Sequence, residues 1–342
     1  MKKFIWIVGL IIGIGAYFAY GFYGKIKSPN TIKEGYVYIN TNATFSELVK
    51  AISPFLGDSE SFEWTAGIKK FTVPKAGKYH IKKGMSNNAL VNMLRIGRQT
   101  PVKVAFNNQH TLAKFAGRIA TQIEADSTAL INAFVDKTFL QTNKFTEAQV
   151  LGMFVPNSYQ FKWNTSANQF RDRMLKEYHK FWNTSRLEKA KKQNLTPIEV
   201  TSLASIVHKE TAKSNERPIV AGLYLNRLRD KWPLAADPTI IFAMKQKYGQ
   251  DFEMRRVLFK NIEDVKDSPY NTYKKQGLPP SLIAMPDITA IDAVLNPKNH
   301  DYYFMCASVT KIGYHEFAKT LKQHNRNRAK YINKKNQQGI RL

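Results

Sequence analysis

The stretch "LTPIEVTSLASIVHKET", residues 195–211, carries the clearest structural signal in the chain. Thr196 is a good helix N-cap, and Pro197 suits the first helical position, where its missing N–H costs nothing. Glu199 stands three residues after the cap and completes a capping box with it. The sequence therefore predicts a helix that begins at Pro197.

The same helix brings one carboxylate close to the protein core. At about 100° per residue, an apolar stripe facing the core is formed by Val200, Leu203, Ala204 and Val207. Lys209 points away from this stripe, whereas Glu210 falls on its margin. Burial there disfavours the ionised carboxylate and raises its pKa, as a general acid working near neutral pH requires. A boundary carboxylate paired with a nearby Arg or Lys is the structural alternative.

His208 lies on the opposite margin of the stripe, and it has no metal-binding context. His208 and Glu210 have the spacing of the His-x-Glu of zinc deaminases, but that site also needs a Pro-Cys-x-x-Cys element. The chain has a single cysteine, Cys306, which excludes an internal disulfide and any multi-thiolate site. It also has no His-Glu-x-x-His. We therefore expect neither a metal nor a cofactor.

The charge of the chain points to an anionic environment. Its 342 residues carry a formal net charge of +26, and they suffice for one large or two smaller domains. Such a surface attracts nucleic acid, anionic lipid headgroups or acidic wall polymers. There is no zinc-finger spacing and no basic region followed by heptads, so the charge by itself does not indicate nucleic-acid binding. No nucleic-acid partner is expected.

The amino terminus predicts an uncleaved membrane anchor. Residues 4–23, "FIWIVGLIIGIGAYFAYGFY", are uncharged, and twenty helical residues at about 1.5 Å each cover a hydrocarbon core of about 30 Å. The Tyr and Phe at the exit suit the interfacial aromatic belt better than a signal-peptide cleavage site. Lys2 and Lys3 are balanced by Lys25 and Lys27, so the flanking charges do not set the orientation.

Two strand-turn-helix patterns follow the anchor. Residues 36–52, "YVYINTNATFSELVKAI", read as an alternating strand and then a helix begun by Thr44 or Ser46. Residues 77–99, "GKYHIKKGMSNNALVNMLRIGRQ", repeat the pattern with Ser86 as the helix cap. Units of this kind form small accessory binding modules or plain α+β subdomains.

Further polar clusters follow the helix at residue 197 in a distinctive order. Together with the helix they resemble the endolytic murein transglycosylase family (MltG/YceG-like). The motifs that carry the resemblance are "LASIVHKET" (203–211), "ERPIVAGLYLNRL" (216–228), "DPT" (237–239), "YNTY" (270–273), "GLPPSLIAMP" (277–286) and "HEFAKTLKQHN" (315–325).

The resemblance covers most of the chain and implies its organisation. The expected class is α+β, with an N-terminal transmembrane helix, a small LysM-like α/β module and a mixed α+β catalytic domain. The implied segments are a membrane anchor at 1–25, a LysM-like subdomain region at 26–105, a mainly helical connecting region at 106–195 and a catalytic transglycosylase domain at 196–342.

The resemblance also implies the site residues. In the family the first motif ends in Glu-Lys-Glu-Thr, and its second glutamate, Glu210 here, is catalytic. The first glutamate is replaced by His208 in this chain. Residues implied to line the glycan cleft or bind substrate are His208, Glu216, Asn226, Asp237, Asn271, Tyr273 and His315. Arg217 and Arg227 are equally suited to bracing the fold.

The implied activity needs only one carboxylate. Glu210 would cleave the bond between N-acetylmuramic acid and N-acetylglucosamine within nascent strands and leave a 1,6-anhydro end, without a cofactor. The implied place is the inner (cytoplasmic) membrane, with the catalytic domain on its periplasmic side, against peptidoglycan strands and peptidoglycan synthases. Two alternatives remain: a muramidase-type hydrolase in which Asp237 or Glu216 activates water, and a non-catalytic wall-binding scaffold.

Overall fold

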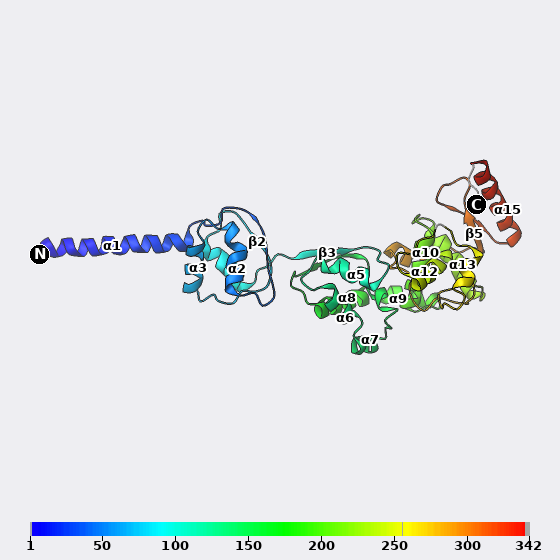
Figure 1. Ribbon diagram of the computed structural model, residues 1–342, viewed down its shortest axis with the longest axis horizontal. Coiled ribbons are helices and arrows are strands. Elements are labelled where there is room, and N and C mark those ends of the chain that lie inside the picture. Colours follow the sequence, from blue (N-terminus) through cyan, green and yellow to red (C-terminus); the bar gives the residue numbers. More distant parts are fainter. Residues whose placement is uncertain (1, 255, 339–342) are drawn as a thin grey trace. The chain divides into compact units, whose positions relative to one another are not determined.

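The structure is a computed structural model that describes residues 2–254 and 256–338. The chain divides into two compact units. The N-terminal unit consists of Met1–Val104, Ile119–Asp126 and Tyr159–Ser166, and the C-terminal unit of Ala105–Arg118, Ser127–Ser158 and Ala167–Leu342. Both units contain helices and strands (Figure 1), so the mixed α+β class predicted from the sequence is confirmed.

The first helix, α1 (Lys2–Lys27), is long and apolar enough over Trp6–Lys27 to cross a membrane. None of that window is buried within the protein. Toward its end the helix contacts the folded module, where the rings of Phe22 and Trp64 meet edge to face at 4.9 Å between centroids. A single N-terminal apolar helix is consistent with the predicted anchor.

The rest of the N-terminal unit is a small module around an antiparallel strand pair. Its elements are β1 (Gly35–Ile39), α2 (Phe45–Ile52), η1 (Ser53–Phe55), α3 (Ser59–Ile68), β2 (Gly77–Ile81) and α4 (Asn87–Ile96). β1 pairs with β2. Thr44 caps α2 in a capping box with Glu47, and Ser86 caps α4. Both strand-turn-helix predictions are thus confirmed at their caps.

The core of this module combines the inward faces of both strands with one side of each helix. Asn87, 1% exposed, ties the module together because its amide nitrogen donates to the Lys25 carbonyl and to Ser61 Oγ, both at 2.9 Å. The buried apolar residues are Val37, Ile39, Leu48, Ile52, Leu56, Phe62, Ala66, Phe71, Tyr79, Ile81, Leu90, Val91 and Leu94.

The middle of the chain is mainly helical, and phenylalanine rings fill its core. The elements are β3 (Val102–Phe106), α5 (Leu112–Ala120), α6 (Ser127–Phe134), α7 (Lys137–Asn143), η2 (Val150–Met153), β4 (Asn157–Phe161), α8 (Ala167–Phe181) and α9 (Thr184–Lys192). β3 pairs with β4. In the C-terminal unit Phe115, Phe134, Phe154 and Phe170 are fully buried and contact one another.

Helix α10 (Pro197–Glu210) begins at the predicted residue. Thr196 Oγ1 accepts from the Glu199 N–H at 3.3 Å, and Glu199 Oε2 accepts from the Thr196 N–H at 2.7 Å. The helix ends at Glu210, because Thr211 is extended. The capping box therefore fixes one end of α10, and the carboxylate of interest stands at the other.

The burial of α10 is wider than the predicted stripe. Every residue from Val200 to Val207 is buried, not one face alone. Helices α11 (Arg217–Arg229), α12 (Asp237–Tyr248) and α14 (Ile288–Leu295) all pack against it. The polar side chains on its remaining face are satisfied, since Ser202 Oγ donates to the Ser281 carbonyl and Ser205 Oγ accepts from the Ile283 N–H, both at 3.0 Å.

The C-terminal part of this unit adds a short hairpin and a helix. α13 (Phe259–Asp264) precedes α14, and β5 (Phe304–Ala307) then pairs with β6 (His315–Ala318) in antiparallel register. α15 (Leu321–Gln337) packs against both strands. The hairpin matters for the site because its second strand begins at His315.

Candidate active site

Glu210 lies at the C-terminal end of α10 and is half-buried. Burial raises the pKa of its carboxyl from 4.5 to about 7. Asp237 acts in the same direction, while a hydrogen bond from Tyr224 and the positive charges of His315 and Arg227 oppose the rise in pKa. At neutral pH the carboxyl is therefore divided between its protonated and ionised forms, as an acid that later acts as a base requires.

Tyr224, on α11, is the direct partner of Glu210. Its hydroxyl donates to Glu210 Oε1 at 2.7 Å, and its side chain is 1% exposed. Burial, followed by the nearby Glu210 charge, raises the pKa of Tyr224 well above 10, so the phenol stays a donor. Sequence reasoning missed this residue, although it stands inside the quoted stretch "ERPIVAGLYLNRL".

Asp237 and Tyr273 form a second pair beside the carboxyl. The Tyr273 hydroxyl donates to Asp237 Oδ1 at 2.5 Å. Asp237 is exposed at the first residue of α12, and Tyr273 is half-buried. The charge of Glu210 contributes to the raised pKa of Tyr273, after burial and the bond to Asp237. These two predicted site residues thus lie close enough to Glu210 for their charges to affect one another.

Glu216 and His315 join α11 to the C-terminal hairpin. Glu216 is 3% exposed, and its two carboxylate oxygens meet the His315 N–H at 2.7 Å and His315 Nδ1 at 2.9 Å. Because His315 in turn lowers the pKa of Glu210, the pair acts on the site through the imidazole. With Asp237 and Tyr273, they are the predicted residues that the structure gathers around Glu210.

Arg227 supplies positive charge near Glu210 while holding the fold. Its Nε donates to the Tyr303 carbonyl at 2.8 Å, and its Nη1 to the Leu234 carbonyl at 2.5 Å. Burial lowers the pKa of the guanidinium. Its bonds are to backbone carbonyls, so its charge is fixed in place beside the carboxyl without forming an ion pair among the described residues.

His208 does not face Glu210. Its Nδ1 lies 3.2 Å from Arg217 Nη2 and 3.3 Å from Asp287 Oδ2, and its side chain is only 15% exposed. Burial is the main cause of its lowered pKa. These contacts arise because the opposite margin of α10 packs against the start of α14, where Asp287 stands. Substrate binding by His208 stays a prediction.

Asn226 and Asn271, predicted as substrate contacts, bond within the protein, and their roles toward a ligand stay predictions. The amide nitrogen of Asn226 donates to the carbonyls of His300 and Tyr302, at 2.8 and 3.1 Å. Asn271 is fully buried; its nitrogen donates to two carbonyls, and its oxygen accepts from the N–H of Tyr273 at 3.1 Å. Both amide nitrogens donate to backbone carbonyls, and the Asn226 oxygen accepts from Arg229 Nη1 at 3.1 Å.

The chain is similar to known proteins over most of its length. A model of the YceG-like family matches residues 37–330. A protein named endolytic murein transglycosylase from Bacillus subtilis (strain 168) is 29% identical over 351 residues, which cover 96% of this chain and 93% of the relative. A protein of the same name from Streptococcus pneumoniae (strain ATCC BAA-255 / R6) is 30% identical over 80% of this chain and 54% of its own length.

A solved structure also matches this chain. The crystal structure of a putative yceG-like protein from Listeria monocytogenes superposes with a TM-score of 0.56 at 25% sequence identity. The match covers 86% of this chain and 98% of the solved one. The similarity therefore extends across both units and is not confined to a single motif.

Proposed function

Because this chain belongs to the YceG-like family, we propose that it is an endolytic lytic transglycosylase of murein. It cleaves the bond between N-acetylmuramic acid and N-acetylglucosamine inside glycan strands. The names of its relatives support the reaction class. The observation that carries the mechanism is the half-buried Glu210, whose pKa is about 7 and whose Oε1 is held by Tyr224.

In the proposed reaction Glu210 acts twice. The protonated carboxyl first gives its proton to the glycosidic oxygen, and the bond from that oxygen to the muramoyl anomeric carbon breaks. The 6-hydroxyl of the same muramoyl residue then attacks the oxocarbenium-like centre and returns its proton to the Glu210 carboxylate. The products are a free N-acetylglucosamine hydroxyl and a 1,6-anhydro end, with no water consumed. Because the 6-hydroxyl belongs to the same sugar as the anomeric carbon, it is already held close to it, and no bound water is needed as the nucleophile.

The residues around Glu210 receive proposed roles from their positions. Asp237 is exposed, Tyr273 is half-buried and both interact electrostatically with Glu210, so we assign them to the sugar at the cleavage point. Asp237 also raises the pKa of Glu210, which favours the protonated acid. His315, held by buried Glu216, lowers the pKa of Glu210 and so favours the carboxylate once it has given up its proton.

The proposed location follows from the anchor and the substrate. Helix α1 is apolar enough to span a membrane, and murein lies outside the cytoplasm. We therefore place the catalytic unit on the outer face of the cytoplasmic membrane, where nascent strands emerge and where peptidoglycan synthases are its proposed neighbours. The LysM-like role of the N-terminal module and the domain limits at 25, 105 and 195 belong to the same proposal.

Product analysis tests the one-carboxylate mechanism. Digestion of purified glycan strands by the full chain is expected to yield muramoyl ends lighter than hydrolytic ends by one water, measured by mass spectrometry. A hydrolase is the competing reading, because Asp237 is near enough to Glu210 to influence its pKa. Reducing ends alone would show that a water, and not the 6-hydroxyl, is the nucleophile.

Tyr224→Phe tests the positioning role of the phenol. Its hydrogen bond favours the ionised carboxylate, so losing it raises the pKa of Glu210 further. The high-pH limb of the kcat/KM profile is expected to move up by about one pH unit, and the plateau to fall about tenfold because the carboxyl loses its orientation. A purely structural tyrosine would change stability and leave the pH limb in place.

A further inference from the structure

A large cavity lies in the C-terminal unit, away from Glu210. Its volume is about 1400 Å³, and its lining includes Thr196, Glu199 and Ser202 from the first half of α10. Glu210 is not among the lining residues. Because the 14 residues of α10 extend over about 20 Å, the cavity and the catalytic carboxyl lie toward opposite ends of one helix.

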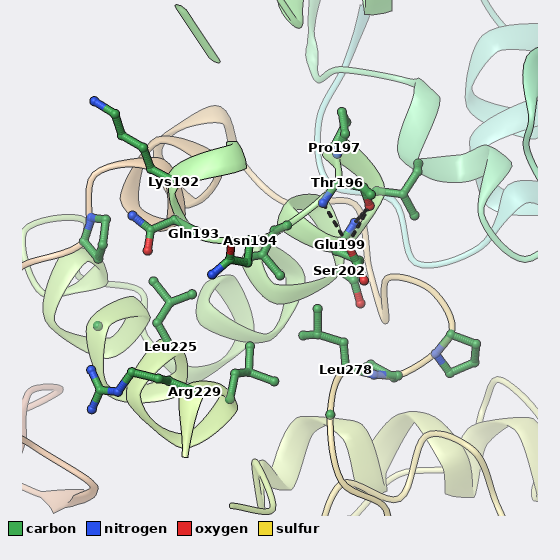
Figure 2. A pocket seen from close by; sticks show the side chains of 18 of the residues that line it. Lys192, Gln193, Asn194, Thr196, Pro197, Glu199, Ser202, Leu225, Arg229 and Leu278 are labelled. Carbon is green, nitrogen blue, oxygen red and sulfur yellow. Dashed lines mark hydrogen bonds between the residues drawn. The ribbon is translucent and has the colours of Figure 1, made fainter. Parts of the chain in front are cut away.

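The charge of the cavity lining is unbalanced. Lys144, Lys192, Lys298 and Arg229 contribute positive charge against the single carboxylate of Glu199. That carboxylate forms part of the helix cap, where it accepts hydrogen bonds from the N–H and the hydroxyl of Thr196 (Figure 2). Arg229 is paired with Asp230 at 2.9 Å.

The three lysines are therefore the uncompensated charges of the cavity. All three are exposed, and none forms an ion pair with a residue in the described part of the chain. They come from three separate places: Lys144 directly follows α7, Lys192 ends α9, and Lys298 follows α14. Three separate segments thus bring like charges to one cavity.

The remaining surface of the cavity suits a peptide. Gln193, Asn194 and Asn299 offer amide donors and acceptors, and Leu225 and Leu278 offer small apolar surfaces. Figure 2 shows Gln193 and Asn194 on the segment leading into α10, with Leu225 on a helix across from them. Such a lining can pair carboxylates, bond to amides and contact aliphatic side chains in one ligand.

The same lining is poorly suited to nucleic acid. Single-stranded nucleic acid is held by basic grooves in which aromatic rings stack on the bases. The phenylalanine and tyrosine of this cavity, Phe145 and Tyr178, are 8% and 7% exposed and pack edge to face on each other, 5.5 Å between centroids. The ring of His300 packs on Tyr302 at 4.6 Å. Their faces are thus occupied within the protein.

We propose that this cavity binds a short acidic peptide. Resting on the proposed function, that peptide is the one attached to the muramoyl residues of the substrate strand. Binding there holds the strand beside the first half of α10, whereas the carboxyl that cuts it stands at the end of the same helix. The enzyme then holds a strand at a second point besides the bond it cleaves, which favours cuts within strands over cuts at their ends.

The test compares strands with and without peptides. The full chain carrying Glu210→Gln, in detergent, is titrated with uncrosslinked murein strands and with the same strands after their peptides are removed by an amidase. Strands with peptides are expected to bind about tenfold more tightly. Adding Lys144→Ala, Lys192→Ala and Lys298→Ala together is expected to abolish that advantage and leave binding of stripped strands unchanged.

A matched triple variant controls for overall charge. Lys176, Lys180 and Lys260 are exposed residues of the same unit that do not line the cavity. Their replacement by Ala is expected to keep the tenfold preference. Equal weakening by both triples, equal affinity for the two strand types, or displacement of peptide-bearing strands by single-stranded DNA at the same lysines would each overturn the proposal.

A cleavage assay distinguishes a failure of the proposed peptide site from a failure of the proposed function. With Glu210 intact, stripped strands that still yield anhydro ends, but bind no less tightly than peptide-bearing ones, would overturn the peptide site alone. Failure to cleave either kind of strand would overturn the proposed function itself.

Discussion

Glu210→Gln is expected to reduce cleavage of murein strands by about a thousandfold, because the amide has no proton to give to the glycosidic oxygen. The amide carbonyl can still accept the hydrogen bond from Tyr224 that holds Glu210 Oε1 at 2.7 Å. The site therefore keeps its shape while it loses its acid. Release of anhydro-ended fragments over time, compared with wild type, measures the loss.

The stability of the same variant is its control. The folded protein raises the pKa of Glu210 from 4.5 to about 7, so the folded state holds this proton more tightly than the unfolded state. The contribution of Glu210 to stability is therefore fully present below pH 4.5 and is lost as the pH rises through about 7. Because a glutamine side chain does not ionise, Glu210→Gln does not lose this stability as the pH rises. It should be more stable than wild type by about 3 kcal/mol at pH 8 and equal to it near pH 4.

Three outcomes would contradict this account of Glu210. Cleavage by Glu210→Gln at a rate close to wild type would mean that another group is the acid. Equal absence of cleavage in wild type and variant would favour the wall-binding scaffold that the replacement of glutamate by His208 suggests. A variant that unfolds at pH 8 more readily than wild type would mean that burial does not raise the pKa of Glu210.

The start of α10 could be predicted because its signals are local. Thr196, Pro197 and Glu199 lie within four residues of one another, and their hydrogen bonds depend on nothing else in the chain. The margin position of Glu210 also follows from helical periodicity alone. Its half-buried place at the end of α10 agrees with that expectation.

The partners of the site could not be predicted because they come from other elements. Tyr224 reaches Glu210 from α11, and no periodicity within α10 reveals which residue of another helix will meet it. The motif order singled out Asn271 as a polar group near aromatics, yet tertiary packing turns its amide onto backbone carbonyls. Sequence identifies a polar residue that matters but not whether it serves a ligand or the fold.

The burial of α10 on every side also depends on residues from other parts of the chain. Ser202 and Ser205 are polar residues outside the apolar stripe that helical periodicity predicts. They are buried because the backbone of residues 281–283 runs past them and pairs with both hydroxyls. That segment lies nearly eighty residues away in sequence. The two serines can lie in the core because this distant segment forms hydrogen bonds with their hydroxyls, and the local sequence does not reveal that contact.

Asp287→Asn is expected to destabilise the C-terminal unit by about 3 kcal/mol. Asp287 Oδ2 lies 3.1 Å from Arg217 Nη1, and the Arg217 side chain is only 5% exposed. Removing the carboxylate leaves a buried guanidinium without its counter-charge, which costs more than the pair contributes while intact. The melting temperature should fall by about 6–12 °C for a unit of this size.

Asp292→Asn is the matched control on the same helix. Asp292 pairs with Arg186 at 3.0 Å, but the Arg186 side chain is 27% exposed, so water can replace the lost partner. Its cost should stay within about 1 kcal/mol. Combining Asp287→Asn with Arg217→Met should cost clearly less than the sum of the two single variants, because no buried charge is then left unpaired.

The comparison also decides the role of His208. In the structure its Nδ1 contacts both Arg217 and Asp287, so a destabilising Asp287→Asn means that the histidine belongs to a network that fixes α10 against the start of α14. The replacement of glutamate by histidine is then compatible with catalysis, because this position is turned away from the reacting carboxyl. If Asp287→Asn costs no more than Asp292→Asn, the network is not needed by the fold, and His208 becomes free to contact the glycan.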